Sequence, residues 1–413
     1  MSLVSSLFTG VTGLASNSEA MGVIGDNISN VNTIGFKGSK AVFSDIFSSV
    51  LSNGSTTSQL GRGAQLSGTL RSLEQGSFES SSNALDLAID GSGFFIVNDG
   101  TGNFYTRAGQ FRMNDNGKVQ ALSGEVLQGS KITNGVPANA TSNIDLAGVQ
   151  SLPQATTIFE LGANLNSAAS ATTSFNSPVT TYNSVGDQVL LNLQFTKTTT
   201  ANKWTYAITT SKGSITSGAS GSVTFGTNGQ LTQIGTGTTV ADQTIVINHS
   251  ASTPVAETQT LTWDVATAAG ASSGKLTGFA AASNNNSVTQ DGYSTGSLVS
   301  LNVDNKGIIK GLFSNGQTSS LYQVAMADFL APTGLTRQGQ NLFAESATSG
   351  QPVIGTAQTG GFGSIIGQSL ELSNVDLAEQ FVALIQTQQA FQASARMITT
   401  TDDLLTEAVN LVR

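Results

Sequence analysis

The feature that most constrains this chain is a pair of long amphipathic segments at its two ends. Residues 373–413 contain no Gly or Pro, and alternating steps of four and three along them trace an apolar stripe interrupted by Gln388 and Asp402. The stripe comprises Leu377, Phe381, Leu384, Phe391, Ala395, Ile398, Leu405, Val409 and Val412. This spacing predicts one helix of roughly 60 Å, which is too long for an ordinary small domain to bury.

The start of this C-terminal helix is marked by residues that cap helices. Ser373, Asn374 and Asp376 precede the stripe, and Glu379 follows Asp376 by three positions. A short polar side chain followed three residues later by Glu is the pattern of a capping box. We therefore expect the helix to begin close to Asp376.

The N-terminal segment has the same periodicity. Its stripe comprises Leu3, Leu7, Gly10, Leu14, Asn17, Met21, Ile24, Ile28 and Val31, and Gly35 follows where a helix would stop. Two interpretations fit a pair of terminal helices so far apart in sequence. They pair as an antiparallel or staggered coiled coil at the root of the molecule, or they pack separately on a globular core.

Charge and length limit the function classes. The 413 residues should form two to four domains, at roughly 100–200 residues per domain. The net charge is -9, and only 17 Lys and Arg residues are spread along the chain. Nucleic-acid binding needs clustered cations, so we exclude a nucleic-acid partner.

Residues suited to catalysis or metal binding are scarce. The chain has no Cys and one His, His249, which we expect to be an inert surface side chain. Asp402 and Asp403 are neighbours on the predicted helix and point in different directions, so they cannot share a substrate. Gly361-Phe362-Gly363 lacks dinucleotide-binding spacing. We predict no catalytic, cofactor or metal site and therefore no enzyme.

Targeting signals are also missing from the sequence. The first basic residue is Lys37, so the N-terminus lacks the charged start of a cleaved leader, and no run of eighteen apolar residues occurs. We expect no membrane span. If the protein acts outside the cell, we expect an export route that uses no cleaved signal peptide.

The sequence between the predicted helices indicates an α+β fold with nested domains, of which all but the outermost are built from one stretch of the first half of the chain and one of the second half. Short strands and Asn/Asp-Gly turns occupy 81–148 and again 291–354, and a second β region at 149–290 predicts a barrel or sandwich. We expect four nested parts: a helical core (1–35 with 372–413), a connector (36–80 with 355–371), an inner β domain (81–148 with 291–354) and an outer β domain (149–290).

The connector has little periodicity. Residues 36–80 are rich in Ser, Gly, Thr and Gln, and we expect an extended segment with a short apolar helix or turn at 42–51. A disordered linker is the alternative interpretation. The Gly- and Ser-rich stretches 52–67 and 355–367 are the expected hinges.

Several motifs resemble one protein family. Their residues are Ile24-Gly25-Asp26-Asn27-Ile28-Ser29-Asn30, then Thr33-Ile34-Gly35-Phe36-Lys37, Tyr105-Thr106-Arg107-Ala108-Gly109-Gln110-Phe111, Gly339-Gln340-Asn341-Leu342-Phe343 and Leu370-Glu371-Leu372-Ser373-Asn374-Val375-Asp376-Leu377. They resemble the flagellar axial family of rod, hook and hook-associated proteins, and within it the hook proteins. Asp26 stands where that family usually has Asn. The resemblance covers about two thirds of the chain and is weaker over 196–290.

The resemblance implies a structural role. Terminal helices of this family form the inner core of a tube, and outer β domains make polar contacts that slide as the curved tube rotates and transmits torque. It implies a homopolymer that contacts the distal rod, hook cap and hook-filament junction proteins. It also implies export by the flagellar type III apparatus to an extracellular hook attached to the basal body.

Two alternatives stay open. One is a distal-rod or hook-associated junction protein, which is similar at its ends but assembles in few copies. The other is a secreted β-rich adhesin or glycan hydrolase anchored by a terminal coiled coil. Self-polymerisation into long curved tubes would separate the hook interpretation from both.

Overall fold

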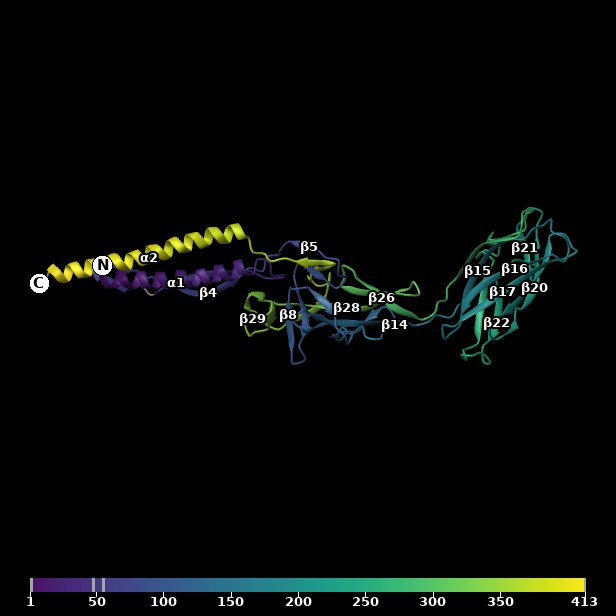
Figure 1. Ribbon diagram of the computed structural model, residues 1–413, viewed down its shortest axis with the longest axis horizontal. Helices are drawn as coiled ribbons and strands as arrows, with labels where there is room; N and C mark the ends of the chain where they lie inside the picture. Colours follow the sequence, from purple (N-terminus) through teal and green to yellow (C-terminus); the bar gives the residue numbers. More distant parts are fainter. Residues whose placement is uncertain (1–2, 47–48, 54–55, 412–413) are drawn as a thin grey trace. The chain divides into compact units, whose positions relative to one another are not determined.

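The computed structural model describes residues 3–46, 49–53 and 56–411, which form two long helices and many short strands (Figure 1). The chain divides into two compact units. The first contains residues 1–148, 300–311 and 319–413, and the second contains 149–299 and 312–318. The protein is therefore mostly β, with one helix near each end of the chain.

Helix α1 (Leu3–Ser29) is shorter than the sequence predicted. Val31 lies beyond its end, in a turn where the Asn30 side chain donates to the carbonyl and carboxylate of Asp26 and accepts from the Thr33 hydroxyl. Side-chain bonds of this kind compete with helix continuation. Gly35 has a φ of 67°, and an added Cβ would lie 2.5 Å from the Ala108 nitrogen, so only Gly fits there.

Helix α2 (Leu377–Leu411) begins where its cap predicted. An Asp376 carboxylate oxygen accepts hydrogen bonds from the backbone nitrogens of Ala378 at 2.7 Å and Glu379 at 3.3 Å. These bonds satisfy two of the free amides of the first turn.

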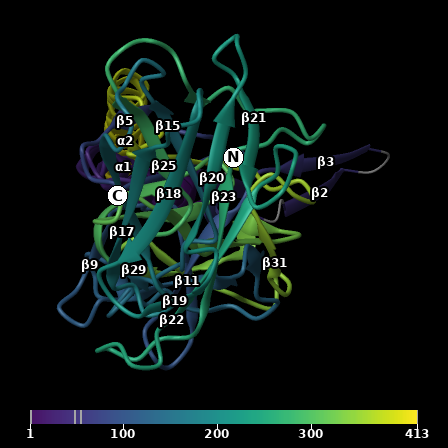
Figure 2. The same cartoon turned by 90° about the vertical axis from the view of Figure 1, so that its right-hand side faces the viewer.

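The short apolar helix or turn predicted at 42–51 is wrong for the residues that the structure describes there, 42–46 and 49–51. The described part of that stretch lies in β1 (Ser39–Asp45), which pairs antiparallel with β4 (Ala64–Arg71), and in β2 (Ser49–Asn53), which pairs with β3 (Thr56–Leu60) as a separate ribbon (Figure 2). Val42 and Phe43 are residues that favour strands, and α1 packs beside β1 and β4. Strands also occupy much of the two expected hinges.

The first unit contains a large, mainly antiparallel sheet. Its path runs β26-β27-β28-β11-β7-β8-β30-β29. These strands are β26 (Gly296–Val303), β27 (Ile308–Phe313), β28 (Thr318–Asp328), β11 (Val126–Thr133), β7 (Phe94–Asn98), β8 (Asn103–Thr106), β30 (Leu342–Ala344) and β29 (Thr336–Gly339). Smaller strands pair at its margins: β9 (Phe111–Met113), β10 (Val119–Ala121), β12 (Val136–Pro137), β13 (Ser142–Asn143) and β31 (Val353–Thr356), and a 3₁₀ turn covers Pro332–Gly334.

Both faces of this sheet are buried. Phe95 and Val97 join one apolar cluster, and Phe94 and Ile96 join another on the opposite face, as the period of two along β7 requires. Two further pairs tie the C-terminal return of the chain to its outward path. They are β6 (Leu87–Asp90) with β32 (Ser364–Gly367), and β5 (Phe78–Ser80) with β33 (Ser369–Glu371).

The second unit is a β-sandwich. One sheet has the order β19-β22-β23-β15-β24 with β25 beside β15, the other has the order β16-β17-β18-β20-β21, and β14 pairs with the start of β26. The strands are β14 (Gln150–Ser151), β15 (Ile158–Asn164), β16 (Ser174–Tyr182), β17 (Gln188–Lys197), β18 (Lys203–Thr210), β19 (Ser214–Ser217), β20 (Ser220–Phe225), β21 (Leu231–Gly235), β22 (Gln243–Asn248), β23 (Gln259–Asp264), β24 (Leu276–Thr277) and β25 (Asn284–Gln290). Side chains from both sheets, including Trp204 and Trp263, form one core.

Candidate functional site

The two terminal helices pack against each other as an antiparallel pair. An added Cβ on Gly10 would lie 2.9 Å from Ile398 Cγ1, and at the other end Asn27 Nδ2 donates to Gln380 Oε1 at 3.0 Å. The N-terminal part of α1 therefore meets the C-terminal part of α2, as Figure 1 also shows. This pairing, together with the junction that joins it to the sheets, is the candidate site.

We call the faces of α1 and α2 that contact each other the seam. The α2 residues in the seam are only partly those of the predicted stripe. Five stripe residues, Leu384, Phe391, Ala395, Ile398 and Leu405, are half-buried. Thr387, Ser394 and Thr401 lie between them on the same face. Each of these three hydroxyls donates to the carbonyl four residues earlier, at 2.7–2.9 Å. Because the helix satisfies the hydroxyls itself, small polar residues can lie in the seam.

The remaining predicted residues on α2 face outward. Leu377, Phe381 and Val409 are 40%, 50% and 65% exposed, and Val412 lies outside the described residues. Gln388 and Asp402, which interrupt the predicted stripe, are also exposed. The step of four from Leu384, Ile398 and Leu405 led to exposed residues, whereas the step of three from Leu384 and Ile398 leads to Thr387 and Thr401 in the seam.

On α1 the seam is lined mostly by small residues. Gly10, Ser16 and Ala20 are buried, and Ile24 is the large side chain among the buried stripe positions. The other predicted residues, Leu7, Leu14, Met21, Ile28 and Val31, are half-buried, and Leu3 lies outside the residues whose side chains are described. Small side chains allow the helix backbones to approach closely.

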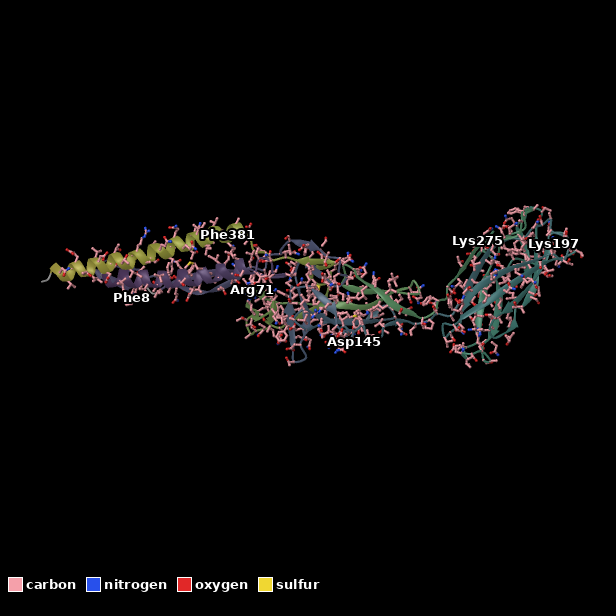
Figure 3. The ribbon with its side chains drawn as sticks, in the orientation of Figure 1. Phe8, Arg71, Asp145, Lys197, Lys275 and Phe381 are labelled. Atoms are coloured by element: carbon pink, nitrogen blue, oxygen red, sulfur yellow. The ribbon has the colours of Figure 1, made fainter. Side chains whose placement is uncertain are left out.

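Large apolar side chains remain uncovered on both helices. Phe8 and Val11 on α1 are exposed, as are Phe381, Val382 and Ile385 on α2. Phe8 and Phe381 lie on the outer sides of the pair (Figure 3). Exposed apolar groups this numerous on a helix pair indicate a surface for protein contacts.

The signature residues near the end of α1 join the helix pair to the strands. The Asn27 side chain accepts from the Ser39 nitrogen at 2.9 Å and donates to the Ser39 carbonyl at 2.8 Å, while also reaching Gln380. It is 2% exposed. Asn27 therefore fixes α1, β1 and α2 at one point.

Phe36 and the adjoining turn dock on the same region. Phe36 is buried beneath the guanidinium of Arg337, whose carbon lies 5.0 Å from the ring centroid. Arg337 also pairs with Asp26 at 3.2 Å. The Asn341 side chain donates to the Ile34 carbonyl at 2.9 Å, and the Gly35 nitrogen donates to the Glu371 carbonyl at 2.8 Å. Gly25, in contrast, has open space around it.

A buried charge cluster lies at the centre of this junction. Lys37 Nζ contacts Glu371 Oε1 at 2.6 Å and donates to the Glu74 carbonyl at 2.7 Å. The other Glu371 oxygen lies 3.4 Å from Arg107 Nη1, and the Gly76 nitrogen donates to the first. The side chains of Lys37 and Glu371 are at most 1% exposed. Burial lowers the pKa of Lys37 and of Arg107, and Glu371 offsets part of the effect.

The C-terminal signature completes the junction. Asn374 accepts from the Gly38 nitrogen at 2.9 Å and donates to the carbonyls of Ser72 and Glu74 at 3.1 and 3.0 Å. An added Cβ on Gly38 would lie 3.1 Å from Val375 Cγ2. Ser373 makes a local contact, in which its hydroxyl accepts a hydrogen bond from the Val375 nitrogen at 3.3 Å. The two ends of the chain are thereby held together just before α2 begins.

Two residues of the site had no assigned role in the sequence prediction. Glu371 and Arg107 lie inside motifs that carried the family resemblance, yet their pairing joins positions 264 apart in sequence. Their one sequence signal is the occurrence of charged residues inside otherwise apolar or small-residue motifs. Such residues are rarely buried unless they are paired.

One side chain considered for catalysis, His249, lies in a different environment from the one that we predicted. His249 is fully buried, whereas we expected a surface side chain. Its Nε2 lies 3.1 Å from Gln259 Oε1, and Gln259 in turn donates to the carbonyls of Thr156 and Tyr182. His249 is thus part of a polar network inside the sandwich. No group of three potential metal ligands occurs within residues 3–46, 49–53 and 56–411.

Comparison with known proteins identifies similar chains over the whole length. Residues 7–37 match the family "Flagella basal body rod protein", 88–149 "Flagellar hook protein FlgE/F/G D1 domain", 151–293 "Flagellar basal body protein FlaE D2 domain" and 366–411 "Flagellar basal body rod FlgEFG protein C-terminal". The flagellar hook protein FlgE of Borreliella burgdorferi is 33% identical over 445 residues, covering 99% of this chain and 100% of the relative. That of Escherichia coli K12 is 32% identical over 419 residues, covering 97% and 98%.

Solved structures also align with this chain. A crystal structure of Helicobacter pylori flagellar hook protein FlgE2 aligns with a TM-score of 0.45 at 14% identity, covering 71% of this chain and 100% of that chain. Among the helices described here, neither is long and apolar enough to cross a membrane.

Proposed function

This chain belongs to the flagellar hook protein family, and from that premise we propose how its parts act as a structural subunit of the bacterial flagellar hook. Many copies polymerise into a curved, flexible tube. The tube transmits torque from the rod to the filament as a universal joint. The subunit is extracellular and attached to the basal body.

The observation that carries the polymer proposal is the uncovered apolar face of the helix pair. Phe381, Val382 and Ile385 are each 50–57% exposed on consecutive turns of α2, and Phe8 and Val11 are exposed on α1. Apolar surface gains about 25 cal/mol per Å² when it leaves water. Contacts of one face with a different face of the next copy generate a helical filament when they do not close into a ring.

The polymerisation core in this proposal consists of the two stripes and the junction. The inner residues of each stripe hold α1 against α2, and the outer residues meet neighbouring copies as a coiled-coil-like core. Residues 1–35 with 372–413 form that core domain, and the four-part domain division predicted from the sequence gives the layers outside it. Gly25 fits this assignment as a helical position without local crowding.

The sandwich has a different role. Its edge strand β25, Asn-Asn-Asn-Ser-Val-Thr-Gln, is exposed along almost its full length. Hydroxyl and amide groups on such a surface exchange contacts with water at little cost. Wet interfaces of this kind hold neighbours weakly, so they can slide while the core stays joined.

A hook subunit lies between the rod and the filament, and this position determines the partners that we propose. The chain contacts itself, the distal rod protein, the hook cap and the hook-filament junction proteins. It reaches the cell exterior through the flagellar type III export apparatus without a cleaved signal peptide. The role requires no enzyme activity.

The test replaces outer apolar residues on α2. Phe381→Ser and Ile385→Ser should raise the concentration needed for tube formation by tenfold or more, at roughly 1.4 kcal/mol per tenfold. Leu330→Ser is the matched control, because Leu330 is 96% exposed but lies outside the helices. Sedimentation and electron microscopy measure assembly, and circular dichroism checks folding. Equal assembly by all the variants would refute the proposal, and assembly only onto an added rod or cap would favour a junction protein.

A further inference from the structure

The first unit contains a cleft beside the buried charge cluster. It has a volume of about 250 Å³ and opens to solvent between the turn at Gly91-Ser92-Gly93 and the end of β28. Lys37 and Arg107 line it, together with Asp328 and the apolar side chains of Leu73, Phe94 and Pro332. The cleft therefore presents two cations and one carboxylate.

Arg107 has bonding capacity that the protein does not use. Its Nη2 donates to the Gly91 carbonyl at 2.7 Å, and its Nη1 lies 3.4 Å from both the Glu371 carboxylate and the Ile89 carbonyl. The Arg107 side chain is only 8% exposed, and its Nε is buried and has no hydrogen-bond partner among the described residues. An unpaired buried donor of a charged group costs free energy, so a ligand that accepts its hydrogen bond is favoured.

Glu371 cannot supply the missing acceptor. One of its oxygens already accepts from Lys37 and the Gly76 nitrogen, and the other faces Arg107 Nη1. Burial lowers the pKa of both cations, and Glu371, with Asp328 at Arg107, offsets only part of this effect. Asp328 lines the cleft but makes no ion pair with either cation among the described residues.

We propose that this cleft is a binding site for an anionic oxygen ligand, either a carboxylate or a small oxyanion such as sulfate, held by Arg107 and attracted by the buried positive charge of Lys37. The Arg107 guanidinium lies over Phe94, 5.3 Å from the ring centroid, which fixes its plane for in-plane hydrogen bonds. Ser92 is exposed at the mouth and adds a hydroxyl donor. The site belongs to the folded subunit and does not depend on polymerisation.

The first experiment titrates the monomeric full-length chain with sodium sulfate at ionic strength held constant with chloride. The Arg107 Nε–H signal, assigned by its loss in Arg107→Lys, should shift saturably in nitrogen-edited NMR spectra. The thermal midpoint of the first unit should rise with the same dependence, since a ligand that binds only the folded state stabilises it.

Charge variants place the effect in the cleft. Asp328→Asn removes the competing carboxylate and should tighten sulfate binding about fivefold, whereas Ser92→Asp adds one at the mouth and should weaken it similarly. Asp115→Asn is the control, because Asp115 is an exposed turn residue outside the cleft. An unmoved Arg107 signal, or one sulfate affinity across all of these variants, would overturn the proposal.

A second arm separates the two sources of the ligand. Radiolabelled sulfate is bound to monomers and to sedimented polymers of the same chain. Equal binding per subunit means that the site takes a free anion. Binding by the monomer that is lost in the polymer means that a carboxylate of a second copy fills the cleft on assembly. Either result supports the anion site, and absence of binding to the monomer refutes it.

Discussion

Replacement of Glu371 by Gln tests the buried charge cluster most sharply. The amide keeps the shape of the carboxylate but removes its charge. Whichever way the amide is turned, its NH₂ group faces a donor, because Lys37 lies on one side of Glu371 and Arg107 on the other. Two buried cations are then left without a counter-charge.

The expected cost follows from the asymmetry of the cluster. Breaking a buried ion pair by removing one partner costs about 3–5 kcal/mol, and Glu371→Gln falls in that range because it affects both cations. Lys37→Met leaves Arg107 with Glu371 and should cost less, about 1–3 kcal/mol. Glu371→Gln should therefore destabilise the first unit by the larger amount.

The chain offers separate probes for its two units. Both Trp residues, Trp204 and Trp263, lie in the sandwich core, whereas α1 and α2 belong to the first unit. Urea unfolding followed by circular dichroism at a helix wavelength reports the helix pair, and Trp fluorescence reports the sandwich. Glu371→Gln should shift the first transition and leave the second in place.

Two results would refute this reasoning. A helix transition that moves less in Glu371→Gln than in Lys37→Met would mean that Glu371 does not serve both cations. A fluorescence transition that moves equally would mean that the loss is not local to the junction. Lys37→Met with Glu371→Gln completes a double-mutant cycle, whose coupling energy isolates the 2.6 Å contact.

Two other predictions concern the seam and the sandwich. Gly22→Ala should raise the free energy of unfolding in the helix transition by about 1 kcal/mol, because open space surrounds Gly22. Gly10→Ala should lack this gain, because the new Cβ meets Ile398. Burial raises the pKa of Asp291, but hydrogen bonds from Thr157 and the next backbone nitrogen outweigh it and bring the pKa below 3.8. The stabilisation is therefore complete above that pH and is lost as pH falls through the folded pKa; Asp291→Asn should remove this acid dependence of the Trp fluorescence midpoint.

The ends of the chain were predictable because their signals are local. The α2 cap needs only Asp376 and the backbone nitrogens of Ala378 and Glu379, and the long Gly-free stretch leaves no other stop before Leu411. The hairpin between β7 and β8 follows from an Asn-Asp-Gly turn between short apolar strands. Local chemistry of this kind does not depend on the rest of the fold.

The phase of the seam was not predictable in the same way. Periodicity identifies which α2 residues are apolar, but it does not reveal which of two apolar faces meets α1. Thr387 and Ser394 lie in the seam although they are polar, because their hydroxyls are satisfied inside the helix. Phe381 faces outward although it is apolar. The packing of α1 decided between the faces, and that packing depends on Gly10.

The prediction for the connector, residues 36–80, was wrong for a related reason. A Ser- and Gly-rich stretch has no strong local preference, so its structure is set by the strand that pairs with it. β1 pairs with β4, although the β2–β3 ribbon lies between them in sequence, and the register of the pairing shifts at a bulge between Val42 and Phe43. The buried pairing of Glu371 with Lys37, 334 positions away, is likewise a property of the tertiary fold.

The contacts of the helix pair are distributed unevenly, and this distribution bears on its function. At the junction between the helix pair and the strands, buried polar bonds fix one arrangement of the helices. These bonds are made by Asn27, Asn374 and the Lys37–Glu371 pair. Along the seam, the helices meet through small side chains and satisfied hydroxyls, which bury little apolar area and specify distance more than strength. The larger apolar side chains are left outside. A subunit built in this way fixes the direction of its helices by itself but relies on other copies to cover their apolar faces. In the polymer that we propose, strong joining comes with assembly, and the sheets outside the core slide against their neighbours.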